Sequence, residues 1–375
     1  MSPQGASARS GGRAGETVLL TGATGFLGME VLARLLEREN TEVICLVRAP
    51  SKEAALMRLD DVYAVLYDDP PAAVARVTAI AGDISVDGLA LSESDRDEVL
   101  ARVTSIVHCA AAISFDLPLE TARATNSAGP VRMLELARTL ADRGQLRRYV
   151  HVSTAYVAGR HHGHFREIDL DLGQGFRNTY EQSKFDGEQA VAKAASELPL
   201  VVARPSIVVG DSRTGWTPVF NVIYWPLRAF SRGLMDEVPV DPEGLADIVS
   251  IDYVAESLIA LLDMEEVDGN IHLVAGADAL TNSELIELAC RHFGRPPPRL
   301  VADPSGTLTE AGVYLPYFGI EATLDNDRAR ALLGPLGLGP VPLRDYFERI
   351  ISYAERARWG KRAVTRQAAA AGHAS

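Results

Sequence analysis

Residues 17–39 read TVLLTGATGFLGMEVLARLLERE, and this stretch decides the fold class. It starts with an apolar, β-branched run of the kind found in buried strands, and it ends with the apolar periodicity of a helix. Gly22, Gly25 and Gly28 stand between the two. Glycines let the backbone turn tightly and approach a pyrophosphate, whose charge then meets the free amides at the positive end of the helix. The stretch therefore predicts a dinucleotide-binding loop between a strand and a helix.

Similar apolar runs recur along the chain and alternate with segments of helical periodicity. They occupy 42–48, 77–83, 105–111, 148–154 and 200–210, and NIHLVAG at 270–276 has the pattern of a last strand. Nearly continuous apolar strands indicate burial on both faces, and the helices between them supply the covering layers. The pattern predicts an α/β fold of the Rossmann type, with a doubly wound parallel sheet.

The composition changes after Gly210, where Trp, Pro, Phe and Gly become frequent. We therefore expect a nucleotide-binding domain and a smaller, interleaved substrate-binding region towards the C-terminus. The first takes residues 17–210 and 245–275, and the second takes 211–244 and 276–360. Residues 1–16 and 361–375 contain little to bury and are expected to be flexible tails.

The bulk properties exclude several classes of protein. The chain has 375 residues and a formal net charge of −13, which argues against a general nucleic-acid-binding surface. No window is long and apolar enough for a membrane span, and the N-terminus lacks the apolar stretch of a secretory signal. The three cysteines have no regular spacing, which favours a reducing compartment. We expect a soluble, cytoplasmic protein.

The histidines do not form a convincing metal site. His108 and His151 lie within predicted strands, where packed core histidines are common. His161, His162 and His164 lie in a polar loop without carboxylate or cysteine ligands at a useful spacing. We predict no metal.

Arg48 ends the second predicted strand, about 20 residues past the glycines, where NAD-specific sites place an acidic residue on the ribose hydroxyls. A guanidinium there can bind a 2′-phosphate through two parallel hydrogen bonds, with Lys52 as a helper. NADPH is therefore the predicted cofactor, and a solvated arginine at a strand exit is the alternative. Asp83, after the third strand, is placed for a hydrogen bond to the adenine, and its alternative is a turn-forming aspartate.

Tyr180 and Lys184 are four residues apart in a segment of helical pattern, so both side chains lie on one face. A nearby ammonium stabilises the phenolate, which lets the tyrosine exchange a proton with a substrate oxygen near neutral pH. Ser153 and Thr154 end the strand RYVHVST, at the edge of the sheet where a hydroxyl can hold that oxygen. Asn126 is expected at the beginning of another helix, where a helix cap competes with a catalytic role.

Four motifs together resemble the extended short-chain dehydrogenase/reductase superfamily: TGATGFLG (21–28), VHVSTAYV (150–157), YEQSK (180–184) and ARPSIVVGDSRTGW (203–216). Within it they are most similar to the thioester reductase and fatty acyl-CoA reductase branch, the male sterility NAD-binding domain. The likeness is close over residues 17–275 and loose over 276–360.

The resemblance implies a role for each catalytic residue. Thr154 would orient the carbonyl, although Ser153 is not excluded, and Tyr180 would be the acid. Lys184 would bind the ribose and activate the tyrosine, Asn126 would support a water and lysine relay, and Arg48 would bind the 2′-phosphate. The predicted cofactor-binding residues are Gly22, Thr24, Gly25, Phe26, Leu27, Gly28, Arg48, Asp83, Ile84, Ala110, Lys184 and Pro205.

The resemblance also implies a function, the NADPH-dependent reduction of an acyl thioester to an aldehyde and, if a second hydride follows, an alcohol. Coenzyme A or a separate carrier protein would deliver the thioester, because the chain stops too soon for the C-terminal domain of animal and plant fatty acyl-CoA reductases and carries no adenylation or carrier domain. Two alternatives stay open. One is an extended short-chain dehydrogenase or epimerase acting on a sugar nucleotide, a steroid or another carbonyl or alcohol, and the other is a non-catalytic protein that senses NADP.

An aromatic and aliphatic segment follows the last cofactor motif, and we expect it to form an apolar wall for an acyl chain. The alternatives are a simple lobe core and a peripheral contact with a membrane. The residues are Trp216, Phe220, Ile223, Tyr224, Trp225, Leu227 and Phe230.

Overall fold

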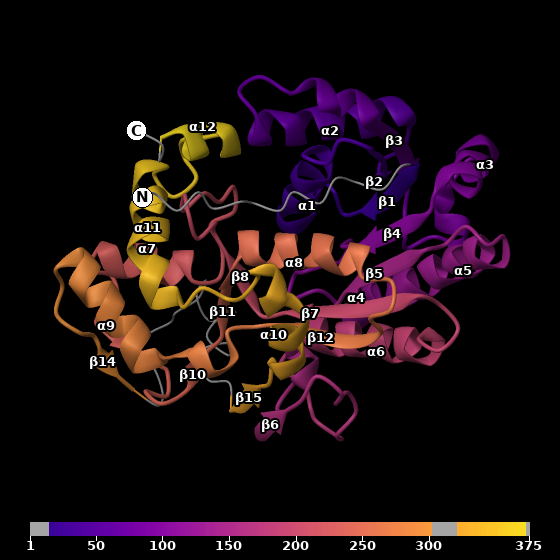
Figure 1. Cartoon of the computed structure of the whole chain (residues 1–375). Coiled ribbons are helices and arrows are strands. Elements are labelled where there is room, and N and C mark those ends of the chain that lie inside the picture. The colour runs from indigo at the N-terminus through magenta and orange to yellow at the C-terminus, as the bar shows by residue number, and fades with distance from the viewer. Residues whose placement is uncertain (1–14, 302–320, 373–375) are drawn as a thin grey trace.

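A seven-stranded parallel sheet forms the centre of the structure, a computed structural model that describes residues 15–301 and 321–372. Its strand order is β12-β7-β5-β4-β1-β2-β3, and all neighbouring strands run parallel (Figure 1). The strands are β1 (Glu16–Thr21), β2 (Thr41–Arg48), β3 (Val77–Gly82), β4 (Ser105–His108), β5 (Arg148–Val152), β7 (Leu200–Pro205) and β12 (Gly269–Leu273). The order reverses between β1 and β4, so their carboxyl ends border the crevice where open α/β sheets bind ligands. The predicted Rossmann-type fold is confirmed.

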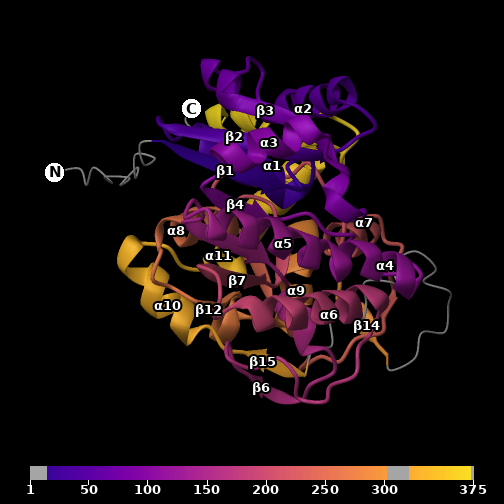
Figure 2. The same ribbon diagram turned by 90° about the vertical axis from the view of Figure 1, so that its right-hand side faces the viewer.

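Helices cover both faces of the sheet because the strands are apolar on both. Along β1, Val18 and Leu20 pack into one buried cluster and Leu19 into another, as the two-residue period of a strand requires. Helices α1 (Phe26–Leu36), α2 (Lys52–Leu66) and α8 (Ile251–Asp263) contribute to the first cluster. Helices α3 (Glu93–Arg102), α5 (Ala128–Asp142) and α6 (Thr179–Ala194) contribute to the second, and Figure 2 shows α5 and α6 side by side.

The predicted strand at 200–210 is two strands in the structure. β7 ends at Pro205, and β8 (Ile207–Val209) pairs with β11 (Ile248–Ser250) rather than with the main sheet. Proline has no N–H to donate, so the ladder is interrupted there. The prediction of one continuous strand is wrong because tertiary pairing with β11 draws the second half away.

A further apolar cluster lies beside the sheet and is built from several of the remaining helices and strands. Tyr224 and Tyr346 are buried in it, so both predicted parts of the substrate-binding region, 211–244 and 276–360, contribute. The division into domains itself stays a prediction. The remaining elements in or beside this cluster are β6 (Gly163–Phe165), α7 (Tyr224–Ser231), β9 (Glu237–Val238), β10 (Leu245–Ala246), β13 (Leu280–Thr281), α9 (Asn282–Phe293), β15 (Ala322–Leu324) and α11 (Leu343–Arg356). Helices α10 (Asp327–Leu333) and α12 (Arg366–Ala371) pack on the first cluster, and the structure also contains α4 (Leu119–Asn126) and β14 (Arg299–Leu300).

The C-terminal segment differs from its prediction as a flexible tail. Residues 361–372 include α12, and Arg366 Nε lies 2.8 Å from Oε2 of Glu30 on α1. Glu30 is only 1% exposed, and a buried carboxylate requires a countercharge. The tail prediction is therefore wrong for this segment, while residues 1–14 and 373–375 lie outside the described residues.

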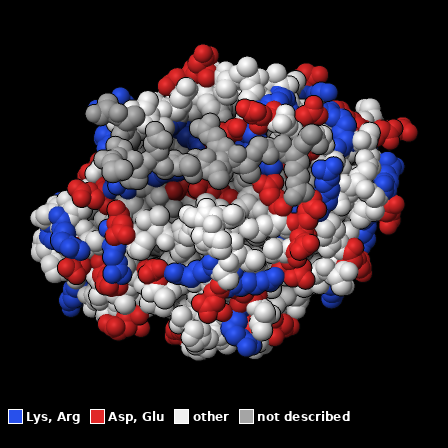
Figure 3. Space-filling view, in the orientation of Figure 1, with Lys and Arg blue, Asp and Glu red and all other residues white. Residues whose placement is uncertain are grey.

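The surface in Figure 3 carries acidic and basic side chains interspersed over one face, rather than gathered by sign. Interspersed charges give no extended field of one sign on that face. Within 15–301 and 321–372, no helix is both long enough and apolar enough to cross a lipid bilayer.

Candidate active site

The glycine loop is a cradle of bare backbone at the carboxyl end of β1. Gly22 has φ +78°, and a Cβ there would lie 2.7 Å from the amide nitrogen of Ala110. A Cβ on Gly28 would lie 2.0 Å from the carbonyl oxygen of Gly22. Helix α1 begins at Phe26, directly after Gly25, which has no side chain to cap the first turn. The loop therefore leaves amides free for an anion, as a pyrophosphate requires.

Two arginines converge at the end of β2. Arg48 is exposed at that end, and its carbonyl oxygen accepts a hydrogen bond of 2.6 Å from Nη1 of Arg58. Nη2 of Arg58 donates to the hydroxyl of Thr24 in the glycine loop, at 3.2 Å. Arg58 is not among the residues predicted from the sequence to bind the cofactor. What could have pointed to it is a basic side chain ten residues after Arg48, in the helix that follows the strand. Lys52, the predicted helper, is exposed at the start of α2.

Asp83 lies directly after β3, as expected, but its carboxylate is engaged in a turn. Oδ1 of Asp83 accepts hydrogen bonds from the amide and the hydroxyl of Ser85, at 2.8 and 2.7 Å. The next residue, Ile84, is buried beside Gly129, where a Cβ would lie 3.0 Å from its Cδ1. The geometry favours the turn-forming role for Asp83, and its contact with adenine stays a prediction.

Three predicted catalytic residues meet at the carboxyl end of β5. Helix α6 places Tyr180 and Lys184 one turn apart, and Nζ of Lys184 donates to the carbonyl oxygen of Val152 at 2.9 Å. The hydroxyl of Thr154 is hydrogen-bonded to the side chain of Tyr180. It also donates to the carbonyl oxygen of Pro205, at 3.3 Å. A hydroxyl, a phenol and an amine thus lie together at the carboxyl edge of the sheet, the same edge at which the glycine loop follows β1.

The environment sets the protonation of this group. Burial raises the pKa of Tyr180 to about 12, although the hydrogen bond with Thr154 acts in the opposite direction and lowers it. The phenol is therefore protonated at neutral pH and can act as an acid. Burial lowers the pKa of Lys184 to about 8, and the negative charge of Glu188 is the largest opposing influence.

The structure distinguishes Ser153 from Thr154. Both side chains are buried, but the hydroxyl of Ser153 donates to Oε2 of Glu188. Thr154, by contrast, contacts Tyr180. The geometry favours Thr154 as the hydroxyl that faces a substrate.

Asn126 does not begin a helix, so that expectation is wrong. It is the last residue of α4, and its side chain holds the loop after β4: Oδ1 accepts from the amide of Ala112 and Nδ2 donates to the carbonyl of the same residue, both at 2.8 Å. Nδ2 also donates to the hydroxyl of Ser183 at 3.0 Å, next to Lys184. The helix-cap role is excluded because these contacts leave its own helix, and its part in a relay stays a prediction.

The histidines are held by other contacts. Nδ1 of His108 lies 2.6 Å from the hydroxyl of Thr21, and burial lowers the pKa of His108 to about 3. His151 packs beside it, with ring centroids 5.3 Å apart. Nδ1 of His162 contacts a carboxylate oxygen of Glu321. In the part of the chain that the structure describes, no three histidine, cysteine or carboxylate side chains are grouped to hold a metal ion.

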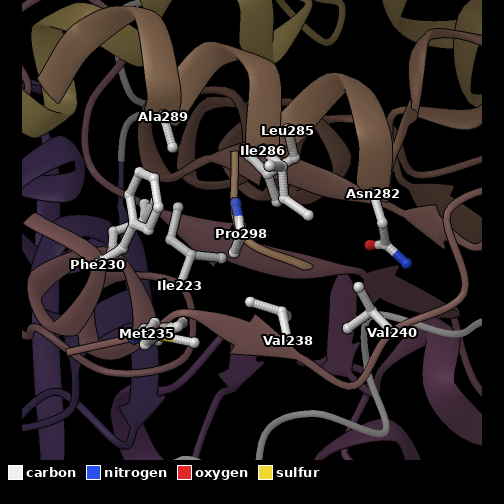
Figure 4. Close-up of a pocket in the computed structure, with 12 residues that line it drawn as sticks. Ile223, Phe230, Met235, Val238, Val240, Asn282, Leu285, Ile286, Ala289 and Pro298 are labelled. Carbon is white, nitrogen blue, oxygen red and sulfur yellow. The ribbon is translucent and has the colours of Figure 1, made fainter. Parts of the chain in front are cut away.

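An apolar groove lies between α7 and α9 (Figure 4). It encloses about 590 Å³, including space open to solvent. Its lining residues are Ile223, Pro226, Leu227, Phe230, Met235, Val238, Val240, Asn282, Leu285, Ile286, Ala289 and Pro298. Every one of them except Asn282 is apolar, so the groove suits a hydrocarbon.

The predicted apolar segment is divided between this groove and the core. Ile223, Leu227 and Phe230 line the groove. Trp216 is buried and donates from Nε1 to the carbonyl of Val364 at 3.1 Å. The other members are Tyr224, whose buried hydroxyl accepts from the amide of Gly210, Phe220, which stacks on Tyr353, and Trp225, which is half-buried.

Residues 20–258, more than half of the chain, match the family described as "Male sterility protein". The fatty acyl-CoA reductase wat of Drosophila melanogaster is 28% identical over 65% of this chain and 53% of its own length. The L-2-aminoadipate reductase large subunit of Penicillium chrysogenum is 31% identical over 65% of this chain and 18% of its own length. The chain thus spans about half the length of the first relative and less of the second.

Solved structures agree with the fold. The terminal R domain from the myxalamid PKS-NRPS biosynthetic pathway is 25% identical, covers 92% of both chains and has a TM-score of 0.78. The UDP-glucuronic acid 4-epimerase of Bacillus cereus, in complex with NAD, is 18% identical over 91% of this chain and 99% of its own, with a TM-score of 0.66. The second likeness shows the fold alone.

Proposed function

The chain belongs to the male sterility protein family, and from this membership we propose that it reduces acyl thioesters with NADPH. The observation that carries the proposal is the meeting of three side chains at the ligand-binding edge of the sheet, where Tyr180 is hydrogen-bonded to Thr154 and Lys184 is held by the carbonyl of Val152. The reductase relatives support a thioester substrate, which coenzyme A or a carrier protein would present.

The residues present fit a nicotinamide dinucleotide. Gly22 and Gly28 leave a cradle that a Cβ would fill, and α1 offers its free amides to the pyrophosphate. Arg48 and Arg58 would bind a 2′-phosphate, and Lys184 the ribose beside the nicotinamide. When bound, NADPH would supply the hydride for the reaction.

The protein's own residues account for the acid chemistry. On substrate binding the Thr154 hydroxyl would turn its proton from the Pro205 carbonyl to the substrate carbonyl oxygen. Tyr180 donates its phenolic proton to the same oxygen as the carbonyl carbon gains hydride. The Lys184 ammonium stabilises the phenolate that remains. The C–S bond of the hemithioacetal then breaks as its C=O bond re-forms and its hydroxyl proton passes to the departing sulfur, so the products are an aldehyde and a free thiol. An alcohol would require a second hydride and a second proton by the same route.

The acyl chain would lie in the groove between α7 and α9. Phe115 supports this placement: its ring lies 5.6 Å from that of Tyr180 and packs on the same apolar cluster as Val238 and Val240 of the groove. One apolar cluster thus includes a residue beside the reactive phenol and residues that line the groove. Burial of each methylene stabilises a bound chain by about 0.8 kcal/mol, so longer acyl groups should bind more tightly.

The proposal predicts NADPH oxidation with medium and long acyl-CoA or acyl-carrier substrates, accompanied by release of free thiol and an aldehyde or alcohol. The measurement is NADPH absorbance with thiol titration and product identification over an acyl series on both carriers. A groove variant, Ala289→Phe, should lower kcat/KM for long chains about tenfold and leave short chains unchanged, because the added ring occupies the groove.

The same panel includes a sugar nucleotide and a hydroxysteroid. Turnover of either, with no thiol released from any acyl substrate, would contradict thioester reduction. It would indicate instead an extended short-chain dehydrogenase or epimerase. A protein that binds NADP but turns over nothing in the panel would be a sensor.

The cofactor proposal predicts a preference for NADPH over NADH that depends on both arginines. Arg48→Ala and Arg58→Ala should each raise KM for NADPH about tenfold and leave KM for NADH within about twofold, because each removes a charge-assisted contact to the 2′-phosphate. Arg96→Ala, which removes an exposed arginine from α3, is the matched control. Equal use of NADH and NADPH by the unaltered protein would contradict the prediction.

A further inference from the structure

Glu188 is a buried carboxylate on α6, one helical turn beyond Lys184, and its side chain is 0% exposed. Oε1 accepts a hydrogen bond of 2.8 Å from Nε of Arg204, whose Nη2 contacts the same oxygen. Oε2 accepts from the hydroxyl of Ser153. Both oxygens are thus bonded to the strands beneath the catalytic group, Ser153 directly after β5 and Arg204 within β7.

The residues at the end of β5 each contact a different group on α6. The Val152 carbonyl accepts from Lys184, the Ser153 hydroxyl donates to Glu188, and the Thr154 hydroxyl meets Tyr180. These three residues are consecutive in the chain, so a shift of Ser153 would move its neighbours at the same time. The contact of Glu188 with Ser153 therefore controls the distance between α6 and the strand end that carries Thr154.

The hydrogen bonds between Glu188 and Arg204 hold α6 against β7 in the same way. Arg204 is also fully buried, and its Nη1 donates to the carbonyl of Glu167 at 3.3 Å and contacts Nε2 of His272 at 3.1 Å. The next residue is Pro205, whose carbonyl oxygen accepts from Thr154. Glu188 thus contacts Ser153, the neighbour of Thr154, and Arg204, the neighbour of the proline whose carbonyl accepts from the Thr154 hydroxyl.

We propose that Glu188 is a positioning residue for the reaction: its carboxylate holds Thr154 and Tyr180 in register through Ser153 and Arg204, and its charge keeps Lys184 an ammonium. The proposal rests on the proposed reductase function for its effect on turnover, and on the place of Glu188 one helical turn from the buried Lys184 for its effect on the lysine.

The groups that face Lys184 from other elements leave this role to Glu188. His108 on β4 and His151 on β5 are neutral, because burial lowers the pKa of the first to about 3 and that of the second well below its usual value. Burial raises the pKa of the Cys109 thiol to about 12, so it is uncharged as well. Arg204 on β7 is paired with Glu188 itself. A buried ammonium without a nearby negative charge loses its proton more easily.

Two variants separate the two effects. Ser153→Ala removes the hydroxyl between Glu188 and β5 but retains the ion pair, so it tests positioning. The double variant Glu188→Gln with Arg204→Met removes both charges and leaves an amide oxygen that can still accept from Ser153, so it tests the charge. Replacing a buried ion pair as a unit avoids leaving one ion unpaired, which would threaten folding. Asp186→Asn is the control, since it removes a negative charge from the exposed side of the same helix, where Asp186 pairs with Arg123.

Ser153→Ala is expected to lower kcat about tenfold, with KM for NADPH and the pH profile unchanged, because a small misplacement of Thr154 affects only the reacting geometry. In the double variant the alkaline limb of NADPH binding, followed by fluorescence without any acyl substrate, should move to lower pH by about one unit. Loss of the Arg204 cation acts in the opposite direction, but Glu188 lies one helical turn from Lys184 and is the larger influence on it, so Lys184 deprotonates at lower pH in the double variant. Melting curves establish that each variant is folded.

Normal kcat in Ser153→Ala would overturn the positioning role. An alkaline limb in the double variant that coincides with that of Asp186→Asn would overturn the charge role. If the double variant does not fold, the single variant Glu188→Gln takes its place in the test of the charge, and Ser153→Ala decides the positioning role independently. Because NADPH binding is measured without a thioester, a failure of the proposed substrate class leaves the result on Lys184 intact.

Discussion

Tyr180→Phe is expected to cut turnover by about 10²- to 10⁴-fold, the usual contribution of a positioned general acid. The substitution removes only the phenolic hydroxyl, which is hydrogen-bonded to Thr154 and is held protonated by burial. The ring contact with Phe115 stays possible, so the fold and the cofactor site should be unaffected. The measurement is kcat with the best acyl thioester, together with NADPH binding by fluorescence titration.

Tyr63→Phe on α2 is the matched control, because it deletes the same hydroxyl away from α6. It should leave kcat unchanged. A Tyr180→Phe protein that binds NADPH and turns over at the normal rate would place the acid on another residue.

Gly28→Ala is expected to weaken NADPH binding by about a hundredfold or more, which corresponds to roughly 3 kcal/mol. The added Cβ would lie 2.0 Å from the carbonyl oxygen of Gly22 and 2.5 Å from its carbonyl carbon. Both are backbone atoms of the cradle, so no side-chain rotation can relieve the clash and the loop must move. Movement of the loop changes the position of the amides that would receive the pyrophosphate.

The control is Gly334→Ala, where a Cβ meets nothing within 4 Å. It should bind NADPH normally. Fluorescence titration measures the affinity, and melting curves separate a damaged loop from a protein that has unfolded. Unchanged affinity in a folded Gly28→Ala variant would show that the cradle between Gly22 and Gly28 does not receive the cofactor.

Much of the fold could be predicted because its signals are local. The strands of the central sheet are continuous apolar runs, and the segment around Tyr180 has a helical period, so each could be assigned from its neighbours in sequence. The glycine loop could be assigned with them, since its spacing and its place between strand and helix are both visible in residues 17–39.

The errors arose where distant segments compete for the same residues. Nothing near residue 206 shows that β8 will pair with β11, about 40 residues further along, instead of continuing β7. The alanine-rich end of the chain has the composition of a tail, but Arg366 is held by Glu30, which lies 336 residues earlier. Asn126 precedes an apolar helical pattern, and only the folded chain shows that its amide binds Ala112 and Ser183.

The sequence by itself determined the parallel sheet, the cofactor loop and the identity of Thr154, Tyr180 and Lys184 as candidates, because period and motif spacing are properties of short segments. Tertiary structure decided which hydroxyl faces Tyr180, that Arg58 joins Arg48, and that Glu188 lies beneath the catalytic group. Those contacts join α6 or α2 to strand ends elsewhere in the chain. Their partners are set by how the helices pack on the sheet, and the packing depends on the burial of the whole core rather than on any one segment.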